Sequence, residues 1–289
     1  MISKTTQIIS LYTNALRLRQ WYKNLIVFLA LFFSTNLFNE PLLLKTCLAF
    51  LALSTIASSS YLINDIIDRK RDLLHPEKKQ RPIASGQISL FAASLLSLIS
   101  LALGLWLSTY LPSVLIYILL IFWLLNLIYS FILKNILFAD ILTIATLFVL
   151  RAIIGALTID VIISPWLIMC PFFLSLFLSI GKRHADLCLL KEKASATRLV
   201  LLQYTPSLTN SLMIIATTLF VLSYALYSFL SPYNHLLYTL PFALYIIFRY
   251  YYLINSGSKI ARHPEQFIYD TPLLIGILLW IIITTVLIY

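Results

Sequence analysis

The chain has 289 residues, of which 61% are hydrophobic and only 11% are charged, and its mean hydropathy is +0.93. Soluble domains are about 45–50% apolar and about 25% charged, and a protein of this size cannot bury so much additional apolar surface. The composition therefore excludes a soluble enzyme, a disordered chain and a disulfide scaffold. It predicts an all-α, polytopic membrane protein that folds as a single domain over residues 1–289.

The apolar runs are continuous and about 20 residues long, which suits membrane-spanning helices better than the alternating strands of a barrel. We expect a bundle of about nine transmembrane helices. The expected spans lie near 24–38, 45–63, 89–109, 113–131, 137–158, 163–180, 210–230, 235–254 and 271–288.

The basic residues predict how this bundle is oriented. The formal net charge is +10, and all but two of the 21 lysines and arginines fall in the N-terminal segment or after the even-numbered spans; the exceptions are Lys45 and Arg151. Cytoplasmic loops of membrane proteins carry such an excess. We therefore expect a multi-pass plasma-membrane protein with a cytoplasmic N-terminus, an external C-terminus and no role for nucleic acid.

An acidic cluster follows the second span, where Asn64, Asp65, Asp68 and Asp72 lie close together. If the helix continues, the spacings of three and four residues place the carboxylates on one face. Carboxylate and amide oxygens are the ligands that Mg²⁺ prefers, and acids at such a depth usually have a function. The alternative is a solvated helix end whose acids pair with the arginines next to them.

Basic residues follow this cluster in a segment bounded by prolines. Lys78 and Arg81 are the candidates here, and bases that face a carboxylate–metal site can stabilise a diphosphate. Lys78 is explained equally well by membrane topology. Arg81 is the stronger candidate, because Pro82 fixes the turn that follows it.

These residues carry a resemblance to a known family. The pattern Asn64-Asp65-x-x-Asp68-x-x-x-Asp72, followed by Arg81-Pro82-Ile83-Ala84-Ser85-Gly86, resembles the first aspartate-rich motif of the UbiA superfamily of intramembrane prenyltransferases. Stretches at 19–24, 129–134 and 181–186 are similar to its decaprenyl-phosphate phosphoribosyltransferase branch.

The resemblance implies a nine-helix fold with active-site loops on the cytoplasmic side. It also implies Mg²⁺-dependent transfer of a 5-phosphoribosyl group from phosphoribosyl diphosphate to a polyprenyl phosphate, a step of cell-envelope biosynthesis that releases diphosphate. Asp65, Asp68 and Asp72 would be the catalytic, metal-binding acids, with Asn64 as a further ligand.

The loop after the sixth span distinguishes this branch from relatives that prenylate aromatic rings. Most of those relatives carry a second aspartate-rich motif here, whereas this chain has Lys182-Arg183-His184-Ala185-Asp186. Additional phosphates favour fixed cations over a second metal site. Lys182, Arg183 and Asp186 are therefore predicted to bind substrate; the alternative is a surface pair between Lys182 and Asp186.

Other candidate substrate-binding residues come from three further segments. Arg151 is deep in the fifth span, where an unpaired arginine costs at least a few kcal/mol, so it either binds a phosphate at the cavity floor or forms a structural ion pair. Tyr129 and Lys134 resemble the Tyr-Lys motif of the superfamily, although their spacing is one residue longer. Lys23 and Asn24 are expected at the cavity mouth.

Two other functions remain open at this stage. The first is an aromatic prenyltransferase of quinone or haem biosynthesis, against which the single acid of the 182–186 stretch argues. The second is a transporter of lipid phosphates or metabolites, which predicts polar residues along several spans. The sequence also leaves open whether the chain forms a homo-oligomer.

Overall fold

The computed structural model describes residues 4–74, 77–190, 199–233 and 235–289, and every regular element within these ranges is helical. Among these residues, eight helices are long and apolar enough to cross a membrane. They are α3 (Glu40–Leu74), α4 (Leu90–Ser108), α5 (Val114–Phe131), α6 (Ala139–Thr158), α7 (Pro165–Leu190), α9 (Pro206–Leu230), η6 with α10 (Leu236–Thr239 and Leu240–Asn255) and α12 (Thr271–Ile288). The shorter elements are α1 (Lys4–Ala15), η1 (Leu18–Val27), α2 (Phe28–Phe33), η2 (Lys78–Gln80), η3 (Leu133–Asn135), η5 (Leu199–Gln203), α11 (Lys259–Arg262) and η7 (Pro264–Tyr269).

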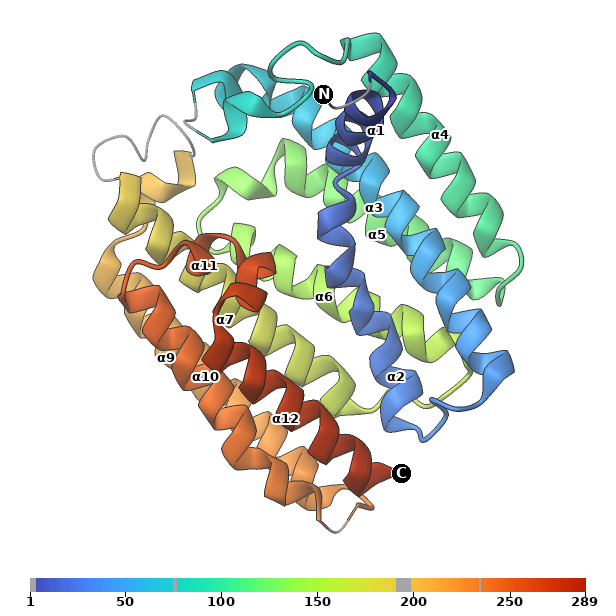
Figure 1. The fold of residues 1–289 in the computed structure, drawn as a ribbon, viewed down its shortest axis with the longest axis vertical. Helices are drawn as coiled ribbons and strands as arrows, with labels where there is room; N and C mark the ends of the chain where they lie inside the picture. Colours follow the sequence, from blue (N-terminus) through green and yellow to red (C-terminus); the bar gives the residue numbers. More distant parts are fainter. Residues whose placement is uncertain (1–3, 75–76, 191–198, 234) are drawn as a thin grey trace.

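The first expected span differs from a regular α-helix. In place of a helix over 24–38, the chain forms the 3₁₀ helix η1 and the six-residue helix α2. A 3₁₀ helix rises about 2.0 Å per residue and an α-helix about 1.5 Å, so η1 and α2 together cover about 29 Å. That length matches the hydrocarbon core of a bilayer, which is about 30 Å thick. Figure 1 shows this segment running from the end of the bundle that holds the N-terminus toward the end that holds the C-terminus.

The 3₁₀ geometry of η1 follows from its contacts with α3. Trp21 Nε1 donates to Ser58 Oγ at 3.0 Å, and Asn24 Nδ2 donates to Ser54 Oγ at 2.9 Å. Three residues of a 3₁₀ helix and four residues of an α-helix both advance about 6 Å, so the polar groups of the two elements meet in register.

A glycine of α6 allows η1 to pack closely on its other side. A Cβ atom on Gly155 would lie 2.0 Å from the backbone oxygen of Val27, so no larger residue fits here without moving η1. The segment is thus held between α3 and α6, and its side chains are fixed relative to both helices.

The two larger apolar cores among the described residues lie in the two halves of the bundle. One lies among α3, α5 and α6 and includes Leu53, Leu115 and Ile154; the other lies among α7, α9 and α10 and includes Phe177 and Met213. Helices α6 and α7 pack on each other and join the two halves.

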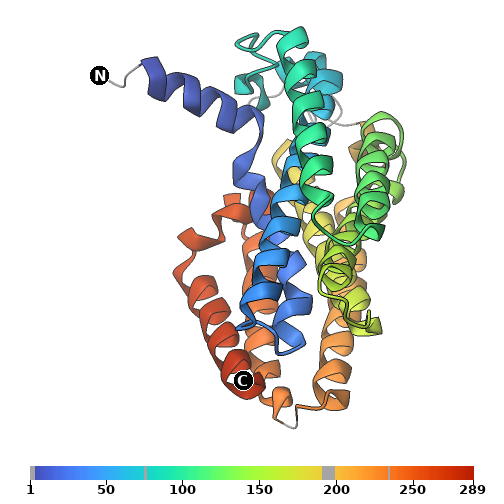
Figure 2. The same cartoon turned by 90° about the vertical axis from the view of Figure 1, so that its right-hand side faces the viewer.

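The outward faces of the spans are apolar and exposed, as at Leu98, Phe248 and Ile282. Such surfaces are stable only in contact with lipid. The chain is therefore a multi-pass membrane protein. Figure 2 shows α1 projecting sideways from the bundle.

Helix α3 positions the acidic cluster. Its 35 residues exceed the roughly 20 that a membrane crossing needs, so the helix continues past residue 63, where the apolar run ends. The spacing of the acids placed them on one face only if the helix continued. That continuous helix over Asp65, Asp68 and Asp72 is present. The three carboxylates consequently point to one side of α3, toward a cavity between the two halves.

Candidate active site

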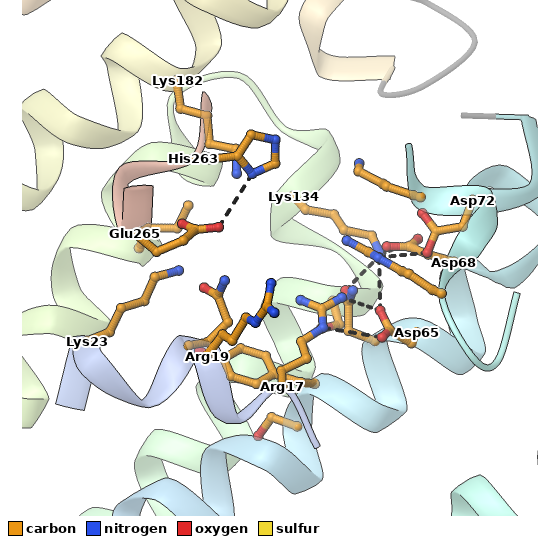
Figure 3. A pocket seen from close by; sticks show the side chains of 18 of the residues that line it. Arg17, Arg19, Lys23, Asp65, Asp68, Asp72, Lys134, Lys182, His263 and Glu265 are labelled. Atoms are coloured by element: carbon orange, nitrogen blue, oxygen red, sulfur yellow. Dashed lines mark hydrogen bonds and ion pairs between the residues drawn. The ribbon is translucent and has the colours of Figure 1, made fainter. Parts of the chain in front are cut away.

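A cavity of about 950 Å³ opens at the end of the bundle where α3 and α7 terminate. Its walls come from α1, η1, α3, α5, α6, α7 and the segments around 77–82 and 262–265. Figure 3 shows Asp65, Asp68 and Asp72 on one side, with Lys23, Lys182, His263 and Glu265 facing them across the space. Every residue predicted as part of the site lines this cavity except Asn24.

The acidic rim consists of Asn64, Asp65, Asp68 and Asp72, and each of its carboxylates contacts a cation. Asp65 accepts hydrogen bonds from Arg17 and, at 2.9 Å, from Nη1 of Arg81. The same Arg81 nitrogen lies 2.6 Å from Asp72 Oδ2. Asp65 and Asp72 are both only 4% exposed, so these pairs are screened little by water.

Lys134 completes the rim from the turn after α5. Its Nζ atom donates to Asp68 Oδ1 at 2.7 Å and to Asn64 Oδ1 at 3.3 Å. The amine is held by η3 and is buried. The alternative was a solvated helix end whose acids pair with the arginines beside them. The structure instead pairs the acids with Arg17 just before η1, Arg81 just after η2 and Lys134 of η3.

The rim has the donor atoms that a divalent cation requires. Within the described ranges, no three Asp, Glu, His or Cys side chains already converge in a way that could hold a metal ion. However, one Arg81 nitrogen bridges Asp65 and Asp72, and Lys134 Nζ bridges Asn64 and Asp68. A single cation can thus reach two rim residues at once, and carboxylate and amide oxygens suit Mg²⁺.

The cavity floor consists of Phe148 and Arg151, and Asn24 lies behind Arg151. Arg151 lies eleven residues beyond Asp140 on α6, which is about 16 Å deeper in the bundle. Its Nε donates to Asn24 Oδ1 and its Nη1 to the Leu147 carbonyl oxygen, both at 2.8 Å. Its guanidinium carbon is 4.9 Å from the ring centre of Phe148.

The sequence left open whether Arg151 binds a phosphate or forms a structural ion pair. These contacts argue against the ion pair. Among the described residues, its hydrogen bonds go to neutral acceptors, and no ion pair involving it is found. Asn24 is 1% exposed and sits behind the arginine rather than at the cavity mouth. It supports Arg151 instead of facing the cavity.

The end of α7 directs its three predicted residues in different directions. Lys182 is exposed and faces the cavity (Figure 3). Arg183 is buried, and its Nε donates to Asp140 Oδ2 at 2.7 Å, while the Tyr204 hydroxyl donates to the other oxygen of Asp140 at 2.8 Å. Asp186 accepts a hydrogen bond from Arg262 at 2.9 Å.

Arg262 and His263 join the two halves of the bundle above the cavity. Arg262 contacts Asp186 and also donates from Nη1 to Glu77 Oε1 at 3.0 Å. His263 lies between Glu77 and Glu265, with nitrogen–oxygen distances of 3.2 and 3.4 Å. This loop bridge, made of Glu77, Arg262, His263 and Glu265, links the segment after α3 to the segment before α12.

Neighbouring charges and hydrogen bonds shift the pKa values of His263 and Glu265 in the loop bridge. The hydrogen bond to Glu265 raises the pKa of His263 above its ordinary value, although burial and the charge of Lys182 oppose this. Burial alone would raise the pKa of Glu265, but the hydrogen bond from His263 and the charge of Lys182 lower it to about 2. The bridge therefore favours a protonated histidine between two ionised carboxylates.

The sequence did not identify Arg17 or the loop bridge as part of the site. Arg17 has a backbone φ of 52°, in the left-handed region, and this turn between α1 and η1 directs its side chain to Asp65. No local pattern marks such a contact across 48 positions of the chain. The loop bridge likewise depends on tertiary contacts between residues about 185 positions apart.

Comparisons with known proteins agree with this architecture. The model of the UbiA prenyltransferase family matches residues 24–269. A decaprenyl-phosphate phosphoribosyltransferase of Mycolicibacterium smegmatis is 33% identical over 93% of this chain and 89% of its own length. The enzyme of the same name from Mycobacterium tuberculosis is 31% identical over 88% of this chain and 85% of its own length.

A solved structure extends the comparison to the fold. A UbiA homolog from Archaeoglobus fulgidus, bound to GPP and Mg²⁺, superimposes with a TM-score of 0.72. The match covers 92% of this chain and 98% of that chain at 20% sequence identity. At that identity the likeness establishes the shared helical fold.

Proposed function

The chain belongs to the UbiA prenyltransferase family, and we propose that it transfers the 5-phosphoribosyl group of phosphoribosyl diphosphate to a polyprenyl phosphate. Diphosphate is the second product. The names of the two mycobacterial relatives support this activity, because each match covers most of both chains. The observation that carries the proposal is the charge of the cavity.

Eleven lysine and arginine side chains line the cavity against six carboxylates, and Asp140 neutralises one of the eleven, Arg183, from outside the cavity lining. About four positive charges are then in excess among the described residues. A phosphate monoester carries up to about two negative charges at neutral pH, so the phosphoribosyl donor and a lipid phosphate together bring about seven. One Mg²⁺ neutralises two of these negative charges, and about five remain for the protein to neutralise. A prenyl diphosphate and an aromatic acid with two metal ions would bring almost no net negative charge. The positive excess of the cavity therefore favours the phosphoribosyl reaction.

The rim residues are the proposed magnesium ligands. Asp65, Asp68 and Asp72 would hold the ion together with Asn64, and Mg²⁺ is also bound in the A. fulgidus homolog. When bound, the ion neutralises charge that develops on the leaving diphosphate. Arg81 and Lys134, which contact these carboxylates, are the proposed cationic contacts to the oxygens of the diphosphate.

The proposed reaction exchanges one bond at C1 of the ribose for another. The bond from C1 to the diphosphate oxygen breaks with its electron pair, and an oxygen of the acceptor phosphate forms a new bond to C1. The acceptor oxygen is already anionic, so attack requires no general base. Lys182, Lys78 and Tyr129 line the same cavity and are the proposed contacts to the remaining donor groups.

The orientation in the membrane is part of the proposal. The rim and the loop bridge lie at the end of the bundle that carries most of the basic residues, and the two termini lie at opposite ends (Figure 1). This supports a plasma-membrane enzyme with a cytoplasmic active site, a cytoplasmic N-terminus and an external C-terminus.

Donor and acceptor preference tests this function. We would reconstitute the purified protein in lipid nanodiscs and offer phosphoribosyl diphosphate or a prenyl diphosphate, each with a polyprenyl phosphate or 4-hydroxybenzoate. The expected result is product only from phosphoribosyl diphosphate with polyprenyl phosphate, and only with Mg²⁺. Prenylated 4-hydroxybenzoate would establish the aromatic prenyltransferase instead. Flux of substrate across sealed vesicles without covalent product would establish a transporter.

A further inference from the structure

The charge at the cavity floor is held by neutral groups. Arg151 is 3% exposed, yet it lines the cavity, and it is bonded to Asn24 and to a backbone carbonyl. Its guanidinium also lies 4.8 Å from the ring centre of Phe122. Burying a charge inside a membrane protein is costly unless an opposite charge accompanies it. A substrate anion is the partner that would remove this cost.

The floor is rigidly built before any substrate binds. Asn24 is held from behind by Ser54 of α3, and Gly155 of α6 lets the backbone of η1 approach closely at Val27. Arg151 itself is fixed by two hydrogen bonds and two aromatic rings. A side chain prepared in this way binds an anion with little loss of conformational freedom.

The floor and the acidic rim lie at different depths. Ser54, which bonds Asn24, precedes Asp65 by eleven residues on α3, or about 16 Å along the helix axis. The Arg151 side chain extends over part of this separation. The space that remains lies between a rim suited to a metal-bound diphosphate and a floor that carries a fixed positive charge.

The chemistry of the transfer assigns the two ends to different substrates. An incoming phosphate that displaces diphosphate must approach C1 from the face opposite the leaving group. If the rim holds the diphosphate, an acceptor phosphate at the floor, which lies deeper in the bundle, would approach C1 from a side away from the rim. The wall beside the floor is apolar, with Ile144, Leu147, Phe148 and Leu178, and therefore suits a prenyl chain.

We propose that Arg151 binds the phosphate of the lipid acceptor, with Asn24 as the positioning residue of Arg151. The assignment rests on the proposed function. It predicts that the cavity discriminates a polyprenyl phosphate from the uncharged polyprenol of equal length through Arg151, while the donor is bound elsewhere.

Two variants separate this role from a structural one. Arg151→Gln removes the charge. Asn24→Asp keeps the volume and gives Arg151 a carboxylate partner, which stabilises the buried arginine but cancels the charge of the floor. A purely structural role for Arg151 predicts that Asn24→Asp is harmless. The acceptor subsite predicts that it weakens lipid-phosphate binding.

The experiment measures three equilibria in nanodiscs: binding of labelled polyprenyl phosphate, of the polyprenol of equal length, and of labelled phosphoribosyl diphosphate with Mg²⁺. Both variants are expected to weaken polyprenyl-phosphate binding by about 10- to 100-fold, because Arg151→Gln removes the charge that binds the phosphate and Asn24→Asp cancels it. Binding of polyprenol and of the donor should stay within about twofold of wild type. Arg249→Gln is the matched control, because Arg249 is bonded to Asp270 and does not line the cavity.

The other outcomes overturn the assignment. A loss of donor binding would place the donor's own 5-phosphate at the floor, and an equal loss of both lipids, or no loss, would leave Arg151 a structural residue. Turnover in the same nanodiscs keeps the two proposals apart. If wild type transfers no phosphoribosyl group, the proposed function fails; if it does so and the variants bind polyprenyl phosphate normally, the floor assignment alone fails.

Discussion

The acidic rim and the cavity floor hold positive charge in opposite ways. At the rim, Arg17, Arg81 and Lys134 each contact a carboxylate of α3, so the charges cancel in place. At the floor, Arg151 is surrounded by an amide, a carbonyl and aromatic rings, which cancel nothing.

This difference separates two kinds of phosphate binding. A rim cation can move to a phosphate only when something else neutralises the carboxylate it leaves, so anion binding there is coupled to a metal ion. The floor needs no such exchange, because its charge is available as it stands. We therefore expect donor binding to depend strongly on Mg²⁺ and acceptor binding to depend on it little.

The buried pair Arg183–Asp140 provides a third case, in which a cavity-lining cation is paired with a buried carboxylate of a neighbouring helix. Both side chains are at most 3% exposed. Asp140→Asn leaves the guanidinium without its charge partner and should lower the free energy of unfolding by about 3–5 kcal/mol. Thermal unfolding in detergent measures this, with Asp160→Asn at an exposed site as the control. If Asp140→Asn keeps its stability but binds the donor more weakly, Arg183 binds substrate instead.

Removing one rim carboxylate tests the coupling to metal directly. Asp68→Asn should reduce Mg²⁺-dependent transfer at least about 100-fold, because metal stabilisation of a leaving group contributes several kcal/mol. Initial rates over a Mg²⁺ titration measure the effect. Glu40→Gln, at the opposite end of α3, should leave the rate unchanged. Full activity of Asp68→Asn would remove the metal site from the rim.

Removing a rim cation should increase the affinity of the rim for a divalent metal ion. Lys134→Met leaves Asp68 without its partner, so the rim becomes more negative and should bind Mn²⁺, used as a probe, about tenfold more tightly without donor. Transfer should nevertheless slow, since the amine is lost to the phosphates. Paramagnetic resonance titration measures the affinity, with Lys45→Met as the control. Weaker metal binding would show that Lys134 orients the carboxylates instead of competing for them.

Protonation of His263 in the loop bridge should make the smallest of these contributions, a small gain in the free energy of unfolding. The raised pKa of His263 means that its protonation stabilises the fold fully below about pH 6.5, and that this contribution is lost as the pH rises through the higher folded-state pKa. His263 is about one-third exposed, so we expect less than about 1 kcal/mol.

The unfolding temperature measured from pH 6 to pH 9 tests this sign. Wild type should lose stability over the range, and His263→Gln should lose less of it. His235→Gln, at an exposed turn, is the control and should follow wild type. A steeper loss in His263→Gln would show that protonation of His263 destabilises the fold.

Periodic and compositional features of the fold were predictable from the sequence. The long apolar runs predicted the spans, and the spacing of Asp65, Asp68 and Asp72 predicted one carboxylate face once α3 continued past residue 63. Both depend on neighbouring residues alone. The predicted regular helix over 24–38 failed for a different reason: hydrogen bonds to Ser54 and Ser58 of another element favour 3₁₀ geometry, and no local pattern encodes them.

The partners of charged residues were the less predictable part of the site. The sequence predicted that Arg183 and Arg151 bind substrate. It did not predict that Arg183 is paired with Asp140, or that Arg151 has no charged partner among the described residues. Arg17 resembled an ordinary interfacial residue until the turn at its backbone directed it to Asp65. Side-chain pairing of this kind depends on how helices from distant parts of the chain are packed.

The register between η1 and α3 has an evolutionary consequence. A substitution in η1 changes one contact, whereas inserting or deleting a single residue rotates every later residue by about 120°. Such a change before Asn24 would turn it away from both Ser54 and Arg151. Relatives that share this chemistry should therefore preserve the number of residues between Trp21 and Asn24 even where the side chains differ, so that length is under stronger selection here than composition.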